Sequence, residues 1–225
     1  MAEPTDSRRP ELPLVAVIAA VFVWSAIAPH DRFTWFLEVL PVLAAVPLLV
    51  LTWRRFPLTP LAYALIAAHA TILMVGGHYT YAQVPLFNWL RDALGLTRNH
   101  FDRLGHFAQG FVPAIVAREV LLRRTPLRQG GWLFTIVTAI CLAVSALYEI
   151  FEWGVAAATG TAADAFLGTQ GDFWDTQKDM LLCLVGAVAA LLTLSRAHDR
   201  TLARLAGERL PAPERAKSAA GGIYI

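Results

Sequence analysis

Residues 168–192 read GTQGDFWDTQKDMLLCLVGAVAALL, so that an acidic segment opens directly onto a long apolar run. Asp172, Asp175 and Asp179 lie close together at its start, and the run from residue 180 onward carries no charge. A membrane-spanning helix needs roughly 20 mostly apolar residues, and this run provides most of that length. The stretch therefore predicts a membrane helix whose first turns carry three carboxylates.

The composition of the whole chain also indicates a membrane protein. Of its 225 residues, 56% are hydrophobic and only 16% are charged, and the mean hydropathy is +0.51. Soluble domains usually carry about 25% charged residues. The formal net charge of +2 gives no broad basic surface, which argues against a nucleic-acid partner. Cys141 and Cys183 lie in apolar runs, so we expect buried thiols rather than a disulfide.

Six apolar segments are bounded by Pro, Gly or charged residues and are long enough to cross a membrane. We therefore predict an all-α integral membrane protein built as a six-transmembrane-helix bundle. Its membrane domain covers residues 12–195, between cytoplasmic tails at residues 1–11 and 196–225, of which the second is expected to be flexible. The predicted spans are Leu12–Ala28, Phe33–Trp53, Pro60–Gly77, Phe101–Leu122, Trp132–Ala156 and Trp174–Ser195.

A short amphipathic helix is predicted near residues 85–95, between the third and fourth spans. Leu86, Leu90 and Leu94 recur there at helical spacing, and Trp89 suits the boundary between membrane and water. We expect this helix to lie at the membrane interface.

The distribution of basic residues predicts the orientation, because cytoplasmic loops carry an excess of Lys and Arg. With a cytoplasmic N-terminus, fourteen of the 19 Lys and Arg residues fall on the cytoplasmic side and five on the other side. The chain is therefore predicted to be N-in/C-in.

With this topology, unusual polar residues gather at the outer ends of spans three to six. Residues three, four and seven apart share a helix face, and ionisable groups avoid lipid, so these faces are expected to converge on one pocket in the outer half of the membrane. The three faces are Asp102, His106 and Gln109; Ser145, Glu149 and Glu152; and Asp172, Asp175 and Asp179.

The predicted pocket is rich in carboxylates, which cannot all ionise at close range without protons or a cation. A divalent metal is one solution, and the mostly oxygen ligands favour Mg, Mn or Ca over Zn. The candidate metal ligands are Asp102, His106, Glu149, Asp172, Asp175 and Asp179. The candidate catalytic residues are His106, Glu149 and Glu152, and the candidate substrate-binding residues are His78, Tyr79, Gln109 and Lys178.

Simpler interpretations of several polar residues stay open. Asp172 and Asp102 could cap helices, whereas Glu149 and Glu152 lie at a helix C-terminus, where negative charge is disfavoured. Glu38 could join the pocket. Arg103 and Lys178 are expected to lie off the polar faces and to point to lipid headgroups, His69 to be an interhelical histidine, and Arg118 and Glu119 to be ordinary interface residues.

Three strings in the chain closely resemble the YjdF type of bacterial inner-membrane proteins. They are HYTYAQVPLFNWLRDALGLTRNHFDRLGHFAQGF from residue 78, YEIFEW from residue 148 and GTQGDFWDTQKDM from residue 168. The resemblance covers about residues 10–195. It implies a bacterial inner membrane and an acidic site that faces the periplasm, and it supplies no reaction.

A more distant similarity is to the VanZ-like family, which is associated with glycopeptide resistance. The similar positions are Asp102 with His106, Glu149 with Glu152, and Asp175 with Asp179. This chain differs from that family in having Asp179 where Asn is usual and Leu182 where Gly often follows. The similarity implies a shared architecture and leaves the ligand open.

Three functions remain as hypotheses. The first is a membrane-embedded, metal-dependent site that acts on or binds a lipid or a lipid-linked cell-envelope intermediate, with membrane lipids as partners. The second is a proton- or cation-coupled transporter, which the almost wholly apolar inner halves of spans four to six argue against. The third is a non-catalytic membrane binding or assembly protein whose acidic residues are structural.

Overall fold

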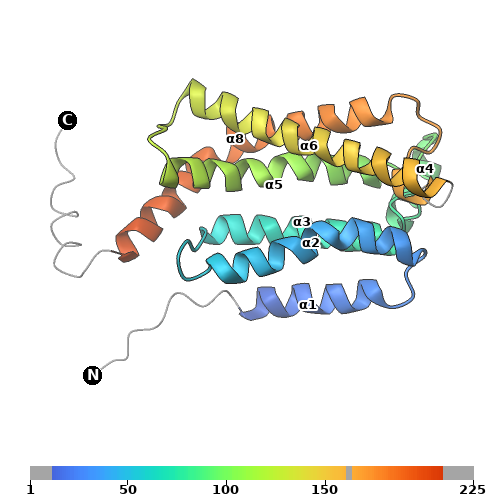
Figure 1. Ribbon diagram of the computed structural model, residues 1–225, viewed down its shortest axis with the longest axis horizontal. Coiled ribbons are helices and arrows are strands. Elements are labelled where there is room, and N and C mark those ends of the chain that lie inside the picture. The colour runs from blue at the N-terminus through green and yellow to red at the C-terminus, as the bar shows by residue number, and fades with distance from the viewer. Residues whose placement is uncertain (1–11, 161–163, 210–225) are drawn as a thin grey trace.

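The computed structural model describes residues 12–160 and 164–209, and each element in those ranges is a helix (Figure 1). The predicted cytoplasmic tail at residues 1–11 and residues 210–225 of the predicted tail at 196–225 lie outside the described residues. The helices are α1 (Leu12–Ala26), α2 (Arg32–Thr52), α3 (Pro60–His78), α4 (Pro85–Leu94), α5 (Phe101–Arg124), α6 (Gly131–Thr159), α7 (Asp164–Leu167) and α8 (Asp175–Arg209).

The predicted all-α membrane class agrees with these helices. Four of those described, α2, α3, α6 and α8, are long and apolar enough to cross a membrane, and α1 is a shorter apolar helix. Helix α5 has 24 residues but carries several charges, so composition alone does not mark it as a span. The predicted short helix near residues 85–95 is confirmed as α4, which ends at Gly95 in the left-handed conformation that favours glycine.

Helix α8 differs from the prediction at both ends. It continues past Ser195 to Arg209, so the first part of the segment predicted as a flexible tail is helical. At its other end it begins at Asp175, and Asp172 lies in the preceding turn. The three aspartates therefore do not share one helix face, as the spacing had predicted; only Asp175 and Asp179 do.

The long helices form two groups that lie side by side (Figure 1). Helices α1 and α2 pack on α3, and α6 and α8 pack on α5, while α3 and α5 contact each other and join the groups. The larger buried core lies between α5, α6 and α8, with Ile115, Val137 and Ala187 at its centre. Cys141 and Cys183 are free thiols in this core, as predicted.

Two glycines let α5 and α8 approach each other closely. A side-chain carbon added at Gly110 would overlap the backbone carbonyl of Cys183, and one added at Gly186 would overlap that of Phe107. Small residues allow close helix packing in membrane bundles, where backbone contact replaces much of the hydrophobic driving force. The close approach brings the polar residues near the start of α5 next to those near the start of α8.

Large apolar side chains cover much of the outside of the bundle. Leu51 is 77% exposed and Leu192 is 74% exposed, and both lie on helices long enough to cross a membrane. A large exposed apolar surface marks a membrane or protein contact. This surface is what a helix bundle surrounded by lipid tails requires.

Arg118 and Glu119 are not ordinary interface residues, and this prediction is wrong. Both are buried near the end of α5, together with His198 of α8. His198 Nε2 lies 3.0 Å from Glu119 Oε2, and Arg118 Nη1 lies 2.9 Å from His198 Nδ1. Glu119 also accepts a hydrogen bond of 2.7 Å from the Thr59 hydroxyl. This ionic network fixes the extended part of α8 to α3 and α5.

Candidate functional site

The predicted acidic residues meet at the end of the bundle where α5 and α8 begin. Asn99 lies two residues before the first residue of α5, and its side-chain oxygen accepts a hydrogen bond of 3.0 Å from the Phe101 amide. Asp102, in the first turn of the helix, is therefore not needed for this hydrogen bond and faces inward. Asp102 and His106 follow one another on the buried face of α5, and Asp179 lies on the facing turn of α8.

His106 is the residue around which the carboxylates are arranged. Its Nε2 lies 3.4 Å from Asp102 Oδ1 and 3.9 Å from Asp179 Oδ1. On the other side of the ring, Nδ1 lies 3.2 Å from Gln109 Oε1 and 3.8 Å from Glu149 Oε1. With the Nδ1 hydrogen donated to Gln109, Nε2 is the nitrogen that faces the two aspartates.

Two arginines pair with the acidic residues of the site. Arg98, in the loop before α5, bonds Asp175 and lies 3.3 Å from Asp102 Oδ2. Arg103 bonds Asp175 and Asp179. The Arg98 side chain is 6% exposed, so its charge is almost fully removed from water. Buried charges require such pairing, because their desolvation is costly.

The prediction that Arg103 points to lipid headgroups is therefore wrong, and Arg98 was not identified as a site residue. Arg98 precedes the helix, so helical spacing cannot place it on a face. Its spacing of four residues from Asp102 and the excess of carboxylates were signals that could have pointed to it. Together the two arginines supply part of the positive charge that the acidic cluster needs.

Asp172 lies at the rim of the site, in the turn before α8. Its carboxylate accepts hydrogen bonds from Lys178 Nζ at 2.7 Å and from the Trp174 amide at 3.1 Å, and it lies 3.0 Å from Arg103 Nη2. The hydrogen bond from Lys178 is the main cause that lowers the pKa of Asp172, and Trp174 and Arg103 also contribute. Lys178, which is half-exposed, thus neutralises a carboxylate on the outer side of the site.

Helix α6 contributes two further buried carboxylates, Glu149 and Glu152. Glu149 Oε1 is buried and makes no hydrogen bond to the described residues, although it lies 3.8 Å from His106 Nδ1. Glu38 of α2, which the sequence suggested might join the pocket, is also buried, and it accepts a hydrogen bond of 3.4 Å from the Tyr148 hydroxyl. An unsatisfied buried carboxylate oxygen is costly, so Glu149 is suited to a ligand or a water molecule that satisfies it.

The structure places His78 and Tyr79, two of the predicted substrate-binding residues, against α1. The His78 ring lies 4.5 Å from the Trp24 ring, and its Nδ1 lies 3.0 Å from the Ser25 carbonyl oxygen. Tyr79 contacts both rings. Their described side-chain contacts do not bring them into the acidic cluster. Gln109, by contrast, joins it through His106.

Of the six predicted metal ligands, three are arranged so that they could hold one ion. Asp102, His106 and Asp179 are all buried, and each offers a ligand atom within 4.8 Å of the other two. Asp175 and Asp172, which pair with the arginines and Lys178, are not part of this group. Within the group, Asp102 also pairs with Arg98 and Asp179 with Arg103. Two carboxylate oxygens and one imidazole nitrogen suit Mn or Zn, and further positions remain for water or substrate.

Comparison with known proteins decides the family. Residues 11–200 match a family model described as "Predicted membrane protein (DUF2238)". The chain is 51% identical to "Inner membrane protein YjdF" of Escherichia coli (strain K12) over 187 residues, which are 83% of this chain and 90% of the relative. The chain belongs to the DUF2238 family. This confirms the predicted resemblance to the YjdF type and the membrane class.

The DUF2238 match includes the whole acidic site, from Arg98 to Asp179, and the ionic network at Glu119 and His198. It ends at residue 200, before the last turns of α8. No solved structure matches the chain. The family description gives a membrane protein without an activity, so the chemistry of this DUF2238 protein is argued from the site.

Proposed function

We propose that the chain crosses the bacterial inner membrane six times, with both ends in the cytoplasm and the acidic site facing the periplasm. The inner membrane is supported by the name of the E. coli relative. The orientation is supported by the excess of arginines at the end of the bundle opposite the site. Helix α5, with 24 residues, is about 36 Å long, which is enough to cross a hydrocarbon core of about 30 Å.

Within this topology, the site is proposed to bind a divalent cation and to act on a lipid or lipid-linked cell-envelope intermediate. The observation that carries the proposal is the buried group of Asp102, His106 and Asp179 beside the unsatisfied Glu149 oxygen. Intramembrane ionisable residues are costly and mark functional sites. The buried, unpaired oxygen of Glu149 supports a ligand-binding role independently of the three-residue group.

The residues have distinct proposed roles. Asp102, Asp179 and His106 Nε2 would hold the cation, which would supply a Lewis acid to a phosphate or ester group. Gln109 would hold the Nδ1 hydrogen of His106, as partners of metal-bound histidines commonly do. Glu149 would accept a proton from the attacking water as a general base.

A lipid substrate is supported by aromatic residues at the rim of the site. Phe173 is 86% exposed and Trp174 is 56% exposed, directly beside Asp172 and Asp175. Trp153, next to Glu152, is 70% exposed. Such residues commonly lie at the interface between hydrocarbon and water, where a lipid headgroup would reach the carboxylates.

Glu149→Gln is expected to abolish turnover while the cation stays bound. Wild-type protein and variant would be incubated with Mn²⁺ in vesicles made from a total bacterial inner-membrane lipid extract, and lipids lost or formed would be identified by mass spectrometry. Removing a general base lowers rates by about 10²–10⁴-fold. Glu149 is not one of the three ligands, so Mn²⁺ content should stay at the wild-type level.

Asp172→Asn is the control, because that rim carboxylate pairs with Lys178 and is outside the metal group. It should retain turnover. If wild-type protein changes no lipid species, or if Glu149→Gln turns over as fast as wild type, the hydrolytic proposal is wrong. A bound lipid that is never converted would favour the non-catalytic binding protein instead.

Transport is a second candidate, since the structure has more buried polar groups along the bundle than the apolar sequence predicted. The Glu119–His198 network lies toward the opposite end of α5 from the acidic site. His69 of α3 has a buried Nε2 without a hydrogen-bond partner among the described residues. Proton flux into proteoliposomes that is lost in His69→Ala would favour transport over hydrolysis.

A further inference from the structure

A buried histidine near the end of α8 takes no part in the chemistry proposed for the acidic site. His198 has no exposed surface, and it lies beyond Ser195, in the part of α8 that extends past the predicted span. Its contacts are with Arg118 and Glu119 of α5, which are buried as well. A buried imidazole between two charged residues is a candidate for a proton-sensitive contact, because histidine is the side chain that ordinarily changes its charge between pH 5 and 8.

The contacts of His198 determine which of its ring nitrogens carries a hydrogen. Arg118 Nη1 lies 2.9 Å from Nδ1, and a guanidinium group can only donate hydrogen bonds, so Nδ1 must be the acceptor. The ring hydrogen is therefore on Nε2, which lies 3.0 Å from Glu119 Oε2 and donates to it. The neutral imidazole uses both of its nitrogens, and the observed contacts leave no place for a second ring hydrogen.

A proton added to Nδ1 would turn this acceptor into a donor that faces another donor. The imidazolium and the Arg118 guanidinium would then be two positive groups whose nearest nitrogens are 2.9 Å apart. The charges around them are already balanced, because Arg118 pairs with Asp199 and Arg123 pairs with Glu119. An additional positive charge buried in this network is costly. The contact between α8 and α5 therefore requires a neutral His198.

Glu119 stays paired when His198 is removed from it. Its carboxylate accepts hydrogen bonds from the Thr59 amide at 3.0 Å and from the Thr59 hydroxyl at 2.7 Å, and it bonds Arg123. Tyr63 of α3 is a further titratable group near Glu119, and a phenol stays uncharged between pH 5 and 8. Separation of His198 from α5 thus leaves no unpaired carboxylate behind, so this contact can open without that penalty.

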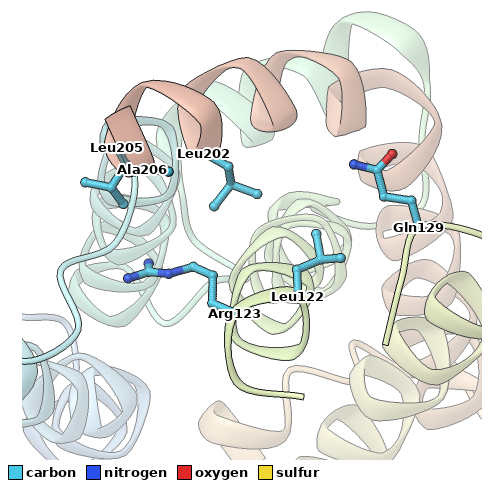
Figure 2. Close-up of a pocket in the computed structure, with 6 residues that line it drawn as sticks. All are labelled: Leu122, Arg123, Gln129, Leu202, Leu205 and Ala206. Carbon is cyan, nitrogen blue, oxygen red and sulfur yellow. The ribbon is translucent and has the colours of Figure 1, made fainter. Parts of the chain in front are cut away.

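The last turns of α8 pack only partly against α5. A cavity of about 360 Å³ lies between the two helices, and Figure 2 shows Leu202 of α8 extending toward Leu122 of α5 across it. The lining residues are Leu122, Arg123, Gln129, Leu202, Leu205 and Ala206. Side chains that face a void lack the dispersion contacts of a packed core. These turns therefore depend on polar contacts such as those of His198 for their position.

We propose that His198 is a proton-sensitive clasp, which holds the last turns of α8 on α5 while its imidazole is neutral and releases them when the imidazole takes up a proton. The released form binds one proton more than the closed form, so the closed form loses stability as the pH falls. A histidine in water takes up its proton near pH 6.5, and release is expected below that pH. In the proposed orientation the clasp lies on the cytoplasmic side of the membrane, but the contacts that carry the inference do not depend on the orientation.

Hydrogen–deuterium exchange of the full-length protein in detergent micelles tests the clasp. The measured quantity is the protection of the backbone amides in residues 200–209 at about pH 7.5 and about pH 5.5, corrected for the intrinsic effect of pH on exchange. Wild-type protein is expected to lose about tenfold in protection between these pH values, which corresponds to one proton taken up near pH 6.5 in the released form.

His198→Gln should abolish this dependence on pH. Glutamine offers a donor and an acceptor but carries no charge at either pH, so the protection of the segment should be the same at both. His69→Gln is the matched control, because it removes another histidine of the bundle, in α3, that lies outside the network. It should lose protection between the two pH values as wild-type protein does.

Arg118→Gln separates the clasp from a merely structural contact. Its amide oxygen can accept the hydrogen of a protonated Nδ1, so the ratio of protection between the two pH values should be largely lost. A structural role of Arg118 would lower protection at both pH values and leave their ratio unchanged. The proposal is overturned by equal protection of wild-type protein at both pH values, or by a wild-type ratio in either His198→Gln or Arg118→Gln.

Discussion

Replacing Arg98 by Gln is expected to lower the free energy of unfolding by about 3–5 kcal/mol, because removing one partner of a buried ion pair leaves the other buried and unpaired. Arg98 bonds Asp175 and Asp102 and also donates to the backbone carbonyl of Gly168 at 3.2 Å. It thus joins the starts of α5 and α8 to the loop between α7 and α8. Reversible unfolding in mixed micelles would measure the loss.

Two further variants show whether burial and geometry cause this loss. Arg91→Gln removes the same charge from an arginine whose side chain is 34% exposed and pairs with Asp92 on α4, where water screens the pair and its contribution to stability is small. Arg98→Lys keeps the charge but lacks the forked donor group of arginine. Its free energy of unfolding should therefore lie between those of wild type and Arg98→Gln. An Arg98→Gln variant as stable as Arg91→Gln would show that the pairing contributes little.

Asp179→Asn is expected to weaken Mn²⁺ binding by at least about 100-fold. Substituting residues that only support metal ligands commonly lowers the metal affinity by about 10–100-fold. Asp179 is proposed to be a ligand itself, so a larger loss is expected. Asparagine keeps the size of the side chain, and Arg103 keeps its contacts with Asp175 and Asp172, so the fold should be retained. Isothermal titration of the purified protein would give both affinities.

Asp172→Asn serves as the control for this titration. It removes the same negative charge from a residue that pairs with Lys178 and lies outside the three-residue group. Its Mn²⁺ affinity should fall only slightly, through the lost charge. If the two variants lose Mn²⁺ affinity equally, the overall negative charge of the site attracts the cation, and Asp179 is not a ligand.

Most of the helix positions could be predicted from the sequence. Apolar runs bounded by Pro, Gly or charge predicted α2, α3 and α6 to within a few residues. The end of α8 could not be predicted in this way. An apolar run marks only the part of a helix that crosses the membrane, and the helix itself can continue beyond it. Beyond Ser195 the chain turns polar, yet it is rich in good helix formers and continues to Arg209 as a helix.

Helical spacing could predict those residues of the candidate site that share one face of a helix. Spacing placed Asp102 with His106 and Glu149 with Glu152. The structure brings His106 close to both Asp102 and Glu149, and it buries Glu152. Spacing could not place Arg98, which precedes the helix. Arg103 was misplaced because its long side chain reaches the carboxylates although its helix position is off their face.

The ionic network at the other end was missed for a related reason. Glu119 and His198 are 79 residues apart, and His198 lies in a segment that was predicted to be a flexible tail. Only the continuation of α8 brings the imidazole back to α5. Sequence spacing describes one helix at a time, whereas this pairing depends on where two helices end relative to each other.

Pulsed electron paramagnetic resonance of the Mn²⁺-loaded protein would show most directly whether Asp102, His106 and Asp179 hold a divalent cation. The nitrogen of a coordinated imidazole couples to the manganese spin. We predict this nitrogen coupling in wild-type protein, its loss in His106→Gln and its retention in His69→Gln, which changes a histidine of α3 outside the three-residue group. A manganese spectrum without nitrogen coupling, or one in which the coupling survives His106→Gln, would contradict the claim.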